Sequence, residues 1–167
     1  MSSEPKILML ATIAGEDRVI SKDGALPWRI PEDEKHFSST IKNQTVIIGR
    51  KAFEANVRDL KNARHKIVLT QNINLFYEGV ITAYSPEDAL QKAQELGSKE
   101  VVVVGGGLSF ATFLPQTTTL YLTVIDQDLA GDITFPECNN FEIVSEEEKK
   151  LGRNTITFTE LERKKAA

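Results

Sequence analysis

The sequence is poor in residues that bind metals or form disulfides. Cys138 is the only cysteine among 167 residues, so neither an internal disulfide nor a cluster of thiolate ligands can form. The two histidines, His36 and His65, lack the spacing of a metal site. We therefore expect no resident metal, and a single free thiol fits a reducing compartment such as the cytoplasm.

Long apolar runs and a strong excess of one charge are also missing. Twenty basic and 24 acidic side chains give a net charge of -4, which argues against nucleic acid or an anionic membrane as the main partner. The short apolar run after MSSEPK soon meets Glu16 and Asp17, so we expect neither a signal peptide nor a membrane span. The length suggests one domain with a sizeable core, and we expect a cytoplasmic monomer.

The sequence does contain many short apolar runs rich in β-branched residues, which favour strands. Strands are predicted at 6–13, 45–49, 65–70, 79–83, 100–104, 118–126, 141–146 and 153–160. Helical patterns lie at about 32–42, 51–57, 86–97 and 107–114. This alternation predicts an α/β fold, a single domain with a mostly parallel twisted sheet of about eight strands. An antiparallel C-terminal strand and about four flanking helices complete the expected architecture.

Two places just after buried strands could bind anions. Gly105–Gly107 open a predicted helix, where free backbone N–H groups and a partial positive charge favour a phosphate. Gly49, Arg50 and Lys51 follow another strand, and two cations at a helix start suit a bound anion. The alternatives are an ordinary tight turn for the glycines and a solvated pair of bases for the cations. Together the two places indicate a ligand with several phosphates, such as a dinucleotide.

Three acids in a row follow Pro31 at the start of the first predicted helix. Glu32, Asp33 and Glu34 are electrostatically favourable there, so an ordinary helix start is one interpretation. Helical spacing separates them, because Asp33 shares an apolar face with Phe37 four residues later. A carboxylate on an apolar face must be paired, protonated or kept for a ligand. Asp33 is therefore the best candidate for a chemical role.

Several segments together resemble dihydrofolate reductase of the bacterial chromosomal type. They are DRVISKDGALPWRIPEDEKHF, VIIGRKAFE, VVVVGGG with FATFLP, and LYLTVIDQDLAGDITFP, in this order between about residues 6 and 162. The resemblance implies one domain over 1–167, with residues of about 44–95 forming the part that binds the cofactor adenosine. It also implies NADPH-dependent reduction of 7,8-dihydrofolate to tetrahydrofolate, with hydride transfer to pterin C6 and water-assisted protonation of N5.

The resemblance also implies roles for single residues around the pterin. Asp33 is expected to bind pterin N3 and the 2-amino group, Trp28 to hold an ordered water, and the Thr123 hydroxyl to bond the carboxylate. Arg64 is expected to clamp the glutamate tail. The implied substrate-binding residues are Ala11, Thr12, Glu34, Phe37, Asn56, Leu60, Arg64 and Val104.

For the cofactor, the resemblance implies contacts from the lid, from the two glycine-containing turns and from the strand ends. Lys51, Thr70 and Gln71 are plausible contacts of the 2′-phosphate, and Gly131 with Asp132 would support the closed lid. The implied cofactor-binding residues are Ile20, Gly24, Ala25, Gly49, Arg50, Lys51, Thr70, Gln71, Gly105, Gly106, Gly107, Leu108 and Phe110.

Some positions depart from the family pattern. Ala52 and Leu108 stand where a threonine and a basic residue are common, which leaves fewer polar contacts to NADPH. Glu34 and Asn56 replace apolar residues of the substrate groove. The same fold could therefore reduce another pterin, of the methanopterin type, or a ribosylated pyrimidine. A non-catalytic module that binds folate or a nucleotide is the alternative from a different class.

Overall fold

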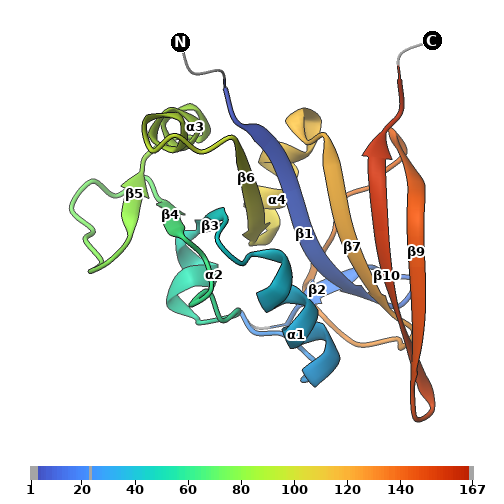
Figure 1. The fold of residues 1–167 in the computed structure, drawn as a ribbon. Coiled ribbons are helices and arrows are strands. Elements are labelled where there is room, and N and C mark those ends of the chain that lie inside the picture. The colour runs from blue at the N-terminus through green and yellow to red at the C-terminus, as the bar shows by residue number, and fades with distance from the viewer. Residues whose placement is uncertain (1–3, 23, 166–167) are drawn as a thin grey trace.

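The computed structural model describes residues 4–22 and 24–165, and these residues form one α/β domain around a twisted sheet (Figure 1). The strands are β1 (Lys6–Ala14), β2 (Val19–Ser21), β3 (Thr45–Gly49), β4 (His65–Leu69), β5 (Ile81–Ala83), β6 (Glu100–Gly105), β7 (Thr119–Ile125), β8 (Ile133–Thr134), β9 (Phe141–Leu151) and β10 (Asn154–Arg163). The helices are α1 (Pro31–Thr40), α2 (Arg50–Glu54), α3 (Pro86–Glu95) and α4 (Gly107–Phe113), and the 3-10 turn η1 (Leu114–Gln116) follows α4.

The main path of the sheet has the order β5-β4-β3-β6-β1-β7-β10-β9. Its first six strands are parallel, and β10 and β9 add two antiparallel strands at one edge. This arrangement confirms the mostly parallel sheet with an antiparallel C-terminal end that the sequence predicts.

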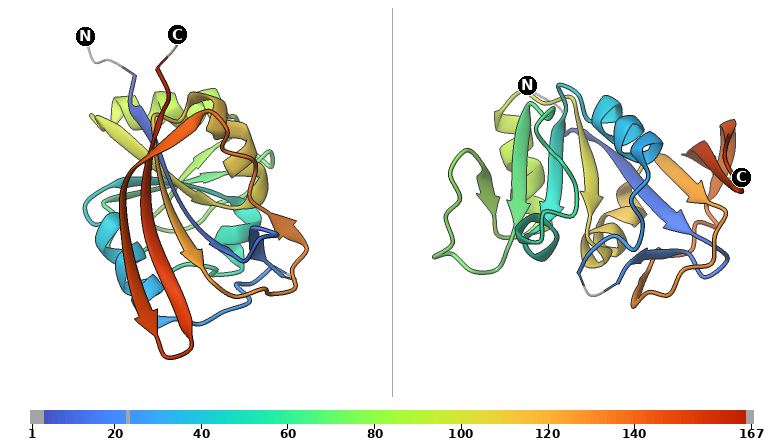
Figure 2. Two further views of the ribbon diagram at one scale, coloured as in Figure 1. Left: turned by 90° about the vertical axis from the view of Figure 1, so that its right-hand side faces the viewer. Right: turned by 90° about the horizontal axis from the view of Figure 1, so that it is seen from below.

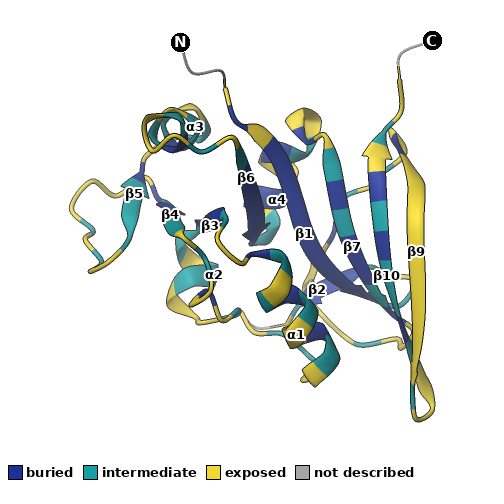
Figure 3. Ribbon diagram, in the orientation of Figure 1, coloured by how far each residue is buried: buried dark blue, intermediate teal, exposed yellow. Residues whose placement is uncertain are grey.

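The sheet buries both of its faces along the central strands. Ile7 and Met9 of β1 belong to one core cluster, whereas Leu8 and Leu10 belong to another, because successive side chains point to opposite faces. Strands β1, β3 and β6 are buried almost throughout (Figure 3). This double burial explains why these strands appear in the sequence as continuous apolar runs.

Helices cover the two faces in pairs. Ala93 of α3 and Phe113 of α4 pack into one cluster, while Phe37 of α1 and Phe53 of α2 pack into the other. None of the helices in the described residues is both long and apolar enough to cross a membrane.

The C-terminal hairpin differs from the rest of the sheet. Strands β9 and β10 extend together well beyond their neighbours (Figure 2), and all but the two end residues of β9 are exposed. Both strands are longer than the predicted ranges 141–146 and 153–160. The sequence does not predict the extension of β9, because charged residues such as Glu146, Glu147 and Glu148 do not alternate with apolar residues as in a half-buried strand.

Helix ends follow local chemistry. The side chain of Ser85 accepts a hydrogen bond from the backbone N–H of Asp88 at 3.0 Å, which confirms the predicted start of α3. Gly97 has φ of +79° and follows the C-cap residue, as predicted for the stop. Helix α2 ends at Glu54 instead of near residue 57, because Asn56 takes a left-handed conformation with φ of +53°.

Candidate functional site

The buried carboxylate of Asp33 is the centre of the candidate site. Pro31 begins α1, and the helix turns Asp33 and Phe37 toward the core, where they are only 1% and 3% exposed. Glu32 in the same turn is half-buried and Glu34 is exposed. The predicted burial of Asp33 on the face of Phe37 is therefore confirmed, whereas the expectation that Glu32 faces water is not, since Glu34 is the more exposed of the two.

Three hydrogen bonds hold the Asp33 carboxylate in place, and a fourth joins two of its donor residues. Thr12 Oγ1 donates to Asp33 Oδ1 at 2.6 Å, and Trp28 Nε1 donates to Asp33 Oδ2 at 3.1 Å. Arg58 Nη1 donates to the same Oδ2 at 2.9 Å, and Arg58 Nη2 donates to Thr12 Oγ1 at 2.7 Å. Since all these groups are buried or half-buried, the carboxylate is paired as a charge on an apolar helix face must be.

Arg58 is the site residue to which the sequence assigned no role. Its side chain is only 7% exposed, and its guanidinium carbon lies 4.5 Å from the centre of the Phe37 ring. Arg58 belongs to the irregular segment between α2 and β4, 25 residues from Asp33 in the chain. The residues around Arg58 in the sequence do not predict a contact with Asp33. The contact depends on the path of the loop between α2 and β4, which brings Arg58 to α1.

The hydrogen bond expected from Thr123 to Asp33 is wrong for this structure. Thr123 Oγ1 is buried without a hydrogen-bond partner, while Thr12 Oγ1 bonds the carboxylate instead. The two threonines are register partners on the neighbouring parallel strands β1 and β7. Their closeness explains the error, since sequence alone cannot decide which of two adjacent hydroxyls reaches a carboxylate.

Trp28 contacts the carboxylate directly. Its indole N–H donates a hydrogen bond to Asp33, and the ordered water expected beside it stays a prediction. Trp28 is half-buried and packs against a small cluster of Ala14, Ile125 and Ile156. This packing fixes the ring, so that its only donor points at the carboxylate.

His36 lies one helical turn away from the Asp33 contacts and packs its ring on Phe158, with ring centres 4.3 Å apart. Burial lowers the pKa of His36 below its usual value of 6.5, although the nearby charge of Asp33 acts in the opposite direction. The neutral imidazole is therefore favoured at neutral pH. The positive charge beside Asp33 comes from Arg58.

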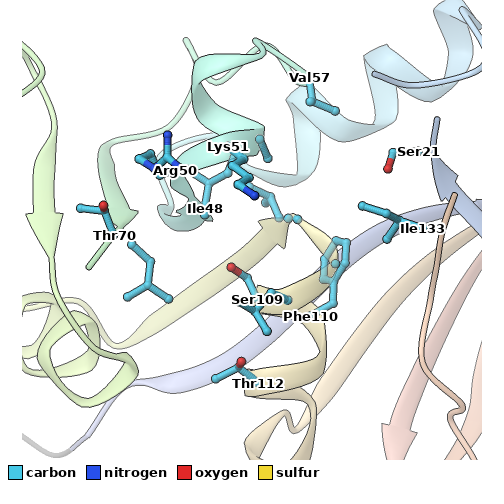
Figure 4. Close-up of a pocket in the computed structure, with 18 of the residues that line it drawn as sticks. Ser21, Ile48, Arg50, Lys51, Val57, Thr70, Ser109, Phe110, Thr112 and Ile133 are labelled. Atoms are coloured by element: carbon cyan, nitrogen blue, oxygen red, sulfur yellow. The ribbon is translucent and has the colours of Figure 1, made fainter. Parts of the chain in front are cut away.

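A large cavity begins at the ends of β1, β3 and β6 and has a volume of about 1050 Å³. Figure 4 shows Arg50 and Lys51 of α2 on one side of it, and Ser109 and Phe110 of α4 facing them. Twelve of the predicted cofactor-binding residues line this cavity: Ile20, Gly24, Gly49, Arg50, Lys51, Thr70, Gln71, Gly105, Gly106, Gly107, Leu108 and Phe110. Ala25 is not among the described residues that line it; this residue is exposed and pairs with Lys22 in an isolated bridge.

The glycines leave room that side chains would fill. A Cβ added to Gly49 would lie 3.0 Å from Ser109 Oγ, and one added to Gly107 would lie 2.6 Å from the Ile133 side chain. Bare backbone thus borders the cavity at the starts of α2 and α4, where N–H groups are free for an anion. With the cations Arg50 and Lys51 alongside, these residues fit a dinucleotide with several phosphates.

Polar side chains at the far end of this cavity are partly paired within the protein. Arg50 forms an ion pair with Glu54 on the next turn of α2. Thr70 is buried, and its hydroxyl accepts a hydrogen bond from the Asn72 backbone at 3.1 Å. Arg50 can therefore exchange Glu54 for a phosphate, which is the stronger partner when several charges are present.

The predicted substrate-binding residues divide into two groups. Ala11, Thr12 and Val104 line the cavity. Phe37 and Leu60 are buried in a core cluster, with Phe37 covered by Arg58. Glu34, Asn56 and Arg64 are exposed and are not among the described residues that line the cavity, so their contacts with substrate stay predictions.

Two short strands that the sequence analysis missed border the cavity. Strand β2 pairs with both β1 and β8, and Ile20, Ser21 and Ile133 from this pair line the cavity. A Cβ on Gly131 would lie 2.2 Å from a Val19 methyl, so the loop can approach β2 only at a glycine. The backbone N–H of Asp132 donates to the Ser21 carbonyl at 3.1 Å, which joins the loop at Gly131 and Asp132 to β2.

Comparisons with known proteins agree with this geometry. A family model described as dihydrofolate reductase matches residues 7–164. The chain is 34% identical to dihydrofolate reductase HdrB of Haloferax volcanii over 97% of this chain and 86% of the relative. It is 36% identical to dihydrofolate reductase of Staphylococcus aureus over 89% of this chain and 92% of the relative.

A solved structure is also similar. It is dihydrofolate reductase from Enterococcus faecalis complexed with NADP(H) and RAB-propyl, with a TM-score of 0.85 and 29% sequence identity. The similarity covers 99% of this chain and 100% of the solved chain.

Proposed function

Because the chain belongs to the dihydrofolate reductase family, we propose that it reduces 7,8-dihydrofolate to tetrahydrofolate with NADPH as the cofactor. The observation that carries this proposal is the buried Asp33, which lies beside one end of a cavity suited to a dinucleotide. A dinucleotide site next to a single buried carboxylate supports hydride transfer to a ring that the carboxylate orients.

In the proposed mechanism, Asp33 accepts hydrogen bonds from pterin N3 and the 2-amino group. Thr12 and Trp28 support this role, because their hydrogen bonds fix the orientation of the carboxylate. NADPH held in the cavity would supply the hydride for pterin C6. The proton for N5 comes from a water molecule that reaches the bound pterin. Asp33 raises the basicity of N5 through its hydrogen bonds to the pterin ring.

Protein groups at the other end of the cavity would hold the cofactor. The glycines at 105–107 and Gly49 would receive the phosphates, with Arg50 as their charge partner. Lys51, Thr70 and Gln71 are the proposed contacts of the 2′-phosphate. Residues of about 44–95, which include β3, α2, β4, β5 and α3, would form the adenosine-binding part of the single domain.

Thr123 keeps a proposed role despite its missing bond to Asp33. A buried hydroxyl without a partner is costly, and it gains a partner when a ligand or a water fills the space beside it. We assign that partner to the bound pterin or to a water at its edge. Arg64 stays a proposed contact of the glutamate tail, at the exposed rim outside the cavity.

The direct test is to mix the purified protein with NADPH and dihydrofolate and to monitor NADPH oxidation by the loss of NADPH absorbance. We expect turnover that requires both compounds. A methanopterin-type pterin is the comparison substrate. Turnover of that pterin without turnover of dihydrofolate would contradict the proposed substrate, and tight binding of both without any turnover would contradict the proposed reaction.

A further inference from the structure

We propose that Arg58 is a built-in competitor for the pterin, which occupies the Asp33 site in the free protein and must leave before substrate binds. This inference rests on the proposed function, since it takes Asp33 as the anchor of the pterin. It makes Arg58 a residue that determines which pterins and inhibitors bind well.

The guanidinium of Arg58 imitates the edge of a pterin. A 2-aminopterin offers Asp33 an N–H and an adjacent amino group in one plane, and a guanidinium offers the same pair of donors. Arg58 uses this pair on Asp33 Oδ2 at 2.9 Å and on Thr12 Oγ1 at 2.7 Å. Asp33 Oδ2 also accepts from Trp28, so the carboxylate has little capacity left for an incoming ligand.

Arg58 imitates the flat face of a pterin as well. Its guanidinium carbon lies 4.5 Å from the Phe37 ring centre, at the distance of a stacked cation. Phe37 is the aromatic on which the proposed substrate would pack. Both surfaces that would recognise the pterin, a carboxylate and an aromatic face, are therefore covered by one side chain.

The outline of the cavity agrees with this occupancy. Arg58 and Thr12 line the cavity, but Asp33, Trp28 and Phe37 are absent from the described residues that do so. The open space thus ends at the outer surface of the guanidinium. A pterin can reach Asp33 only if Arg58 moves.

The position of Arg58 in the chain permits this movement. It lies in the irregular segment between α2 and β4, two residues after the left-handed Asn56. Its neighbours Asp59 and Lys61 are exposed, so a released guanidinium lies close to solvent. Separation of Arg58 from Asp33 loses the Coulomb attraction of a buried ion pair, but water can then hydrate both charged groups. The paired and separated states can therefore be close in free energy.

The consequence is a population effect on affinity. If the closed pair holds about nine-tenths of the free protein, every ligand that needs Asp33 binds about tenfold more weakly than it otherwise would. A ligand with its own carboxylates gives the released Arg58 a new partner, whereas a ligand without them does not. Arg58 thus favours dihydrofolate, with its glutamate tail, over small rings that have only the pterin-like edge.

The test measures binding of 2,4-diaminopyrimidine to the NADPH-bound protein by calorimetry. Arg58→Leu should bind this compound about tenfold more tightly than the wild type. Arg58→Lys should bind it several-fold more tightly, because an ammonium cannot bridge Asp33 and Thr12 as a guanidinium does. Lys61→Leu removes one charge from the same loop at a side chain that is 77% exposed, and should leave the affinity unchanged.

Steady-state kinetics give a second readout that a merely structural role would not produce. With 6-methyl-7,8-dihydropterin, which has no glutamate tail, Arg58→Leu should lower KM about tenfold and leave kcat unchanged. With dihydrofolate the decrease in KM should be smaller, since the wild-type Arg58 gains a partner there.

Two results separate the possible failures. If the Arg58 variants retain the wild-type NADPH affinity but bind 2,4-diaminopyrimidine no more tightly, the competitor role is wrong. If Arg58→Leu does not fold, Arg58→Lys, which keeps the charge, decides the question: no gain in its affinity for 2,4-diaminopyrimidine would show that the competitor role is wrong. If the wild type fails to reduce dihydrofolate while the variants still bind 2,4-diaminopyrimidine more tightly, the proposed function is wrong and the competitor role stands.

Discussion

The two ends of the cleft differ in how far they are prepared for a ligand. At the proposed cofactor end, bare glycine backbone and the cations of α2 border a cavity of about 1050 Å³. At the proposed pterin end, Arg58 covers Asp33 and Phe37. The first end is open, whereas on our proposal the second must release its own side chain before a ligand binds. A site can therefore be fully assembled and still be closed to its ligand.

Loss of the Asp33 charge should break the pterin end most strongly. Asp33→Asn keeps the shape but removes the acceptor of the pterin donors, so kcat/KM for dihydrofolate should fall by about two to four orders of magnitude. The affinity for NADPH should stay unchanged, because Asp33 is not among the described residues that line the cofactor cavity.

Glu32→Gln is the matched control for this variant. It removes a carboxylate from the same first turn of α1, at a half-buried residue with no role in the site. Wild-type turnover in Asp33→Asn, or an equal loss in both variants, would remove the catalytic assignment of Asp33 and leave the fold untouched.

Gly131→Ala should damage the cofactor end alone. The added Cβ would lie 2.2 Å from a Val19 methyl and 2.6 Å from the Ser21 carbonyl, so the β2–β8 pair must separate. We expect a loss of about 1–3 kcal/mol in the free energy of unfolding, together with weaker NADPH binding. Urea denaturation and NADPH titration measure the two effects, and wild-type values in both would show that β8 does not support the cavity.

Lys51→Ala should change the preference for NADPH over NADH. If Lys51 contacts the 2′-phosphate, its removal should weaken NADPH binding about tenfold and leave NADH binding unchanged. Fluorescence titration with both cofactors measures the difference, with Lys61→Ala as the control for the charge alone. An equal loss for both cofactors would place Lys51 on a phosphate that they share.

Glu34→Leu should have the smallest effect. In the family pattern, this position is expected to touch the benzoyl part of folate, and an apolar residue there would tighten binding. Glu34 is exposed and lies outside the described residues that line the cavity, so we expect inhibitor affinity to change by less than about 0.5 kcal/mol. A clear gain in affinity would show that Glu34 faces the bound ligand.

The fold could be predicted where each strand has its own apolar signal. Strands β3 and β4 lie almost where the runs at 45–49 and 65–70 place them, because strands buried on both faces are continuously apolar. Strands β2 and β8 span three and two residues, which is too short for any periodicity. Their pairing depends on Gly131 and on the loops around it, so only the structure could reveal it.

The candidate site could be predicted in part for the same physical reason. The spacing of four residues on a helix was enough to predict that Asp33 is buried on the same face as Phe37. The partners of Asp33 come from other parts of the chain: Arg58 is 25 residues away and Thr12 is 21 residues away. The loop path between α2 and β4 decides that Arg58 reaches α1, and this path carries no local sequence signal.

The most direct measurement is a crystal structure of the NADPH-bound protein with 2,4-diaminopyrimidine. We predict that Asp33 accepts the hydrogen bonds of the ligand and that the ring lies over Phe37, with the Arg58 guanidinium moved beyond hydrogen-bond distance of Asp33. An Arg58 that still donates to Asp33 at about the present 2.9 Å, with the ligand bound elsewhere, would contradict both the anchor and its competitor.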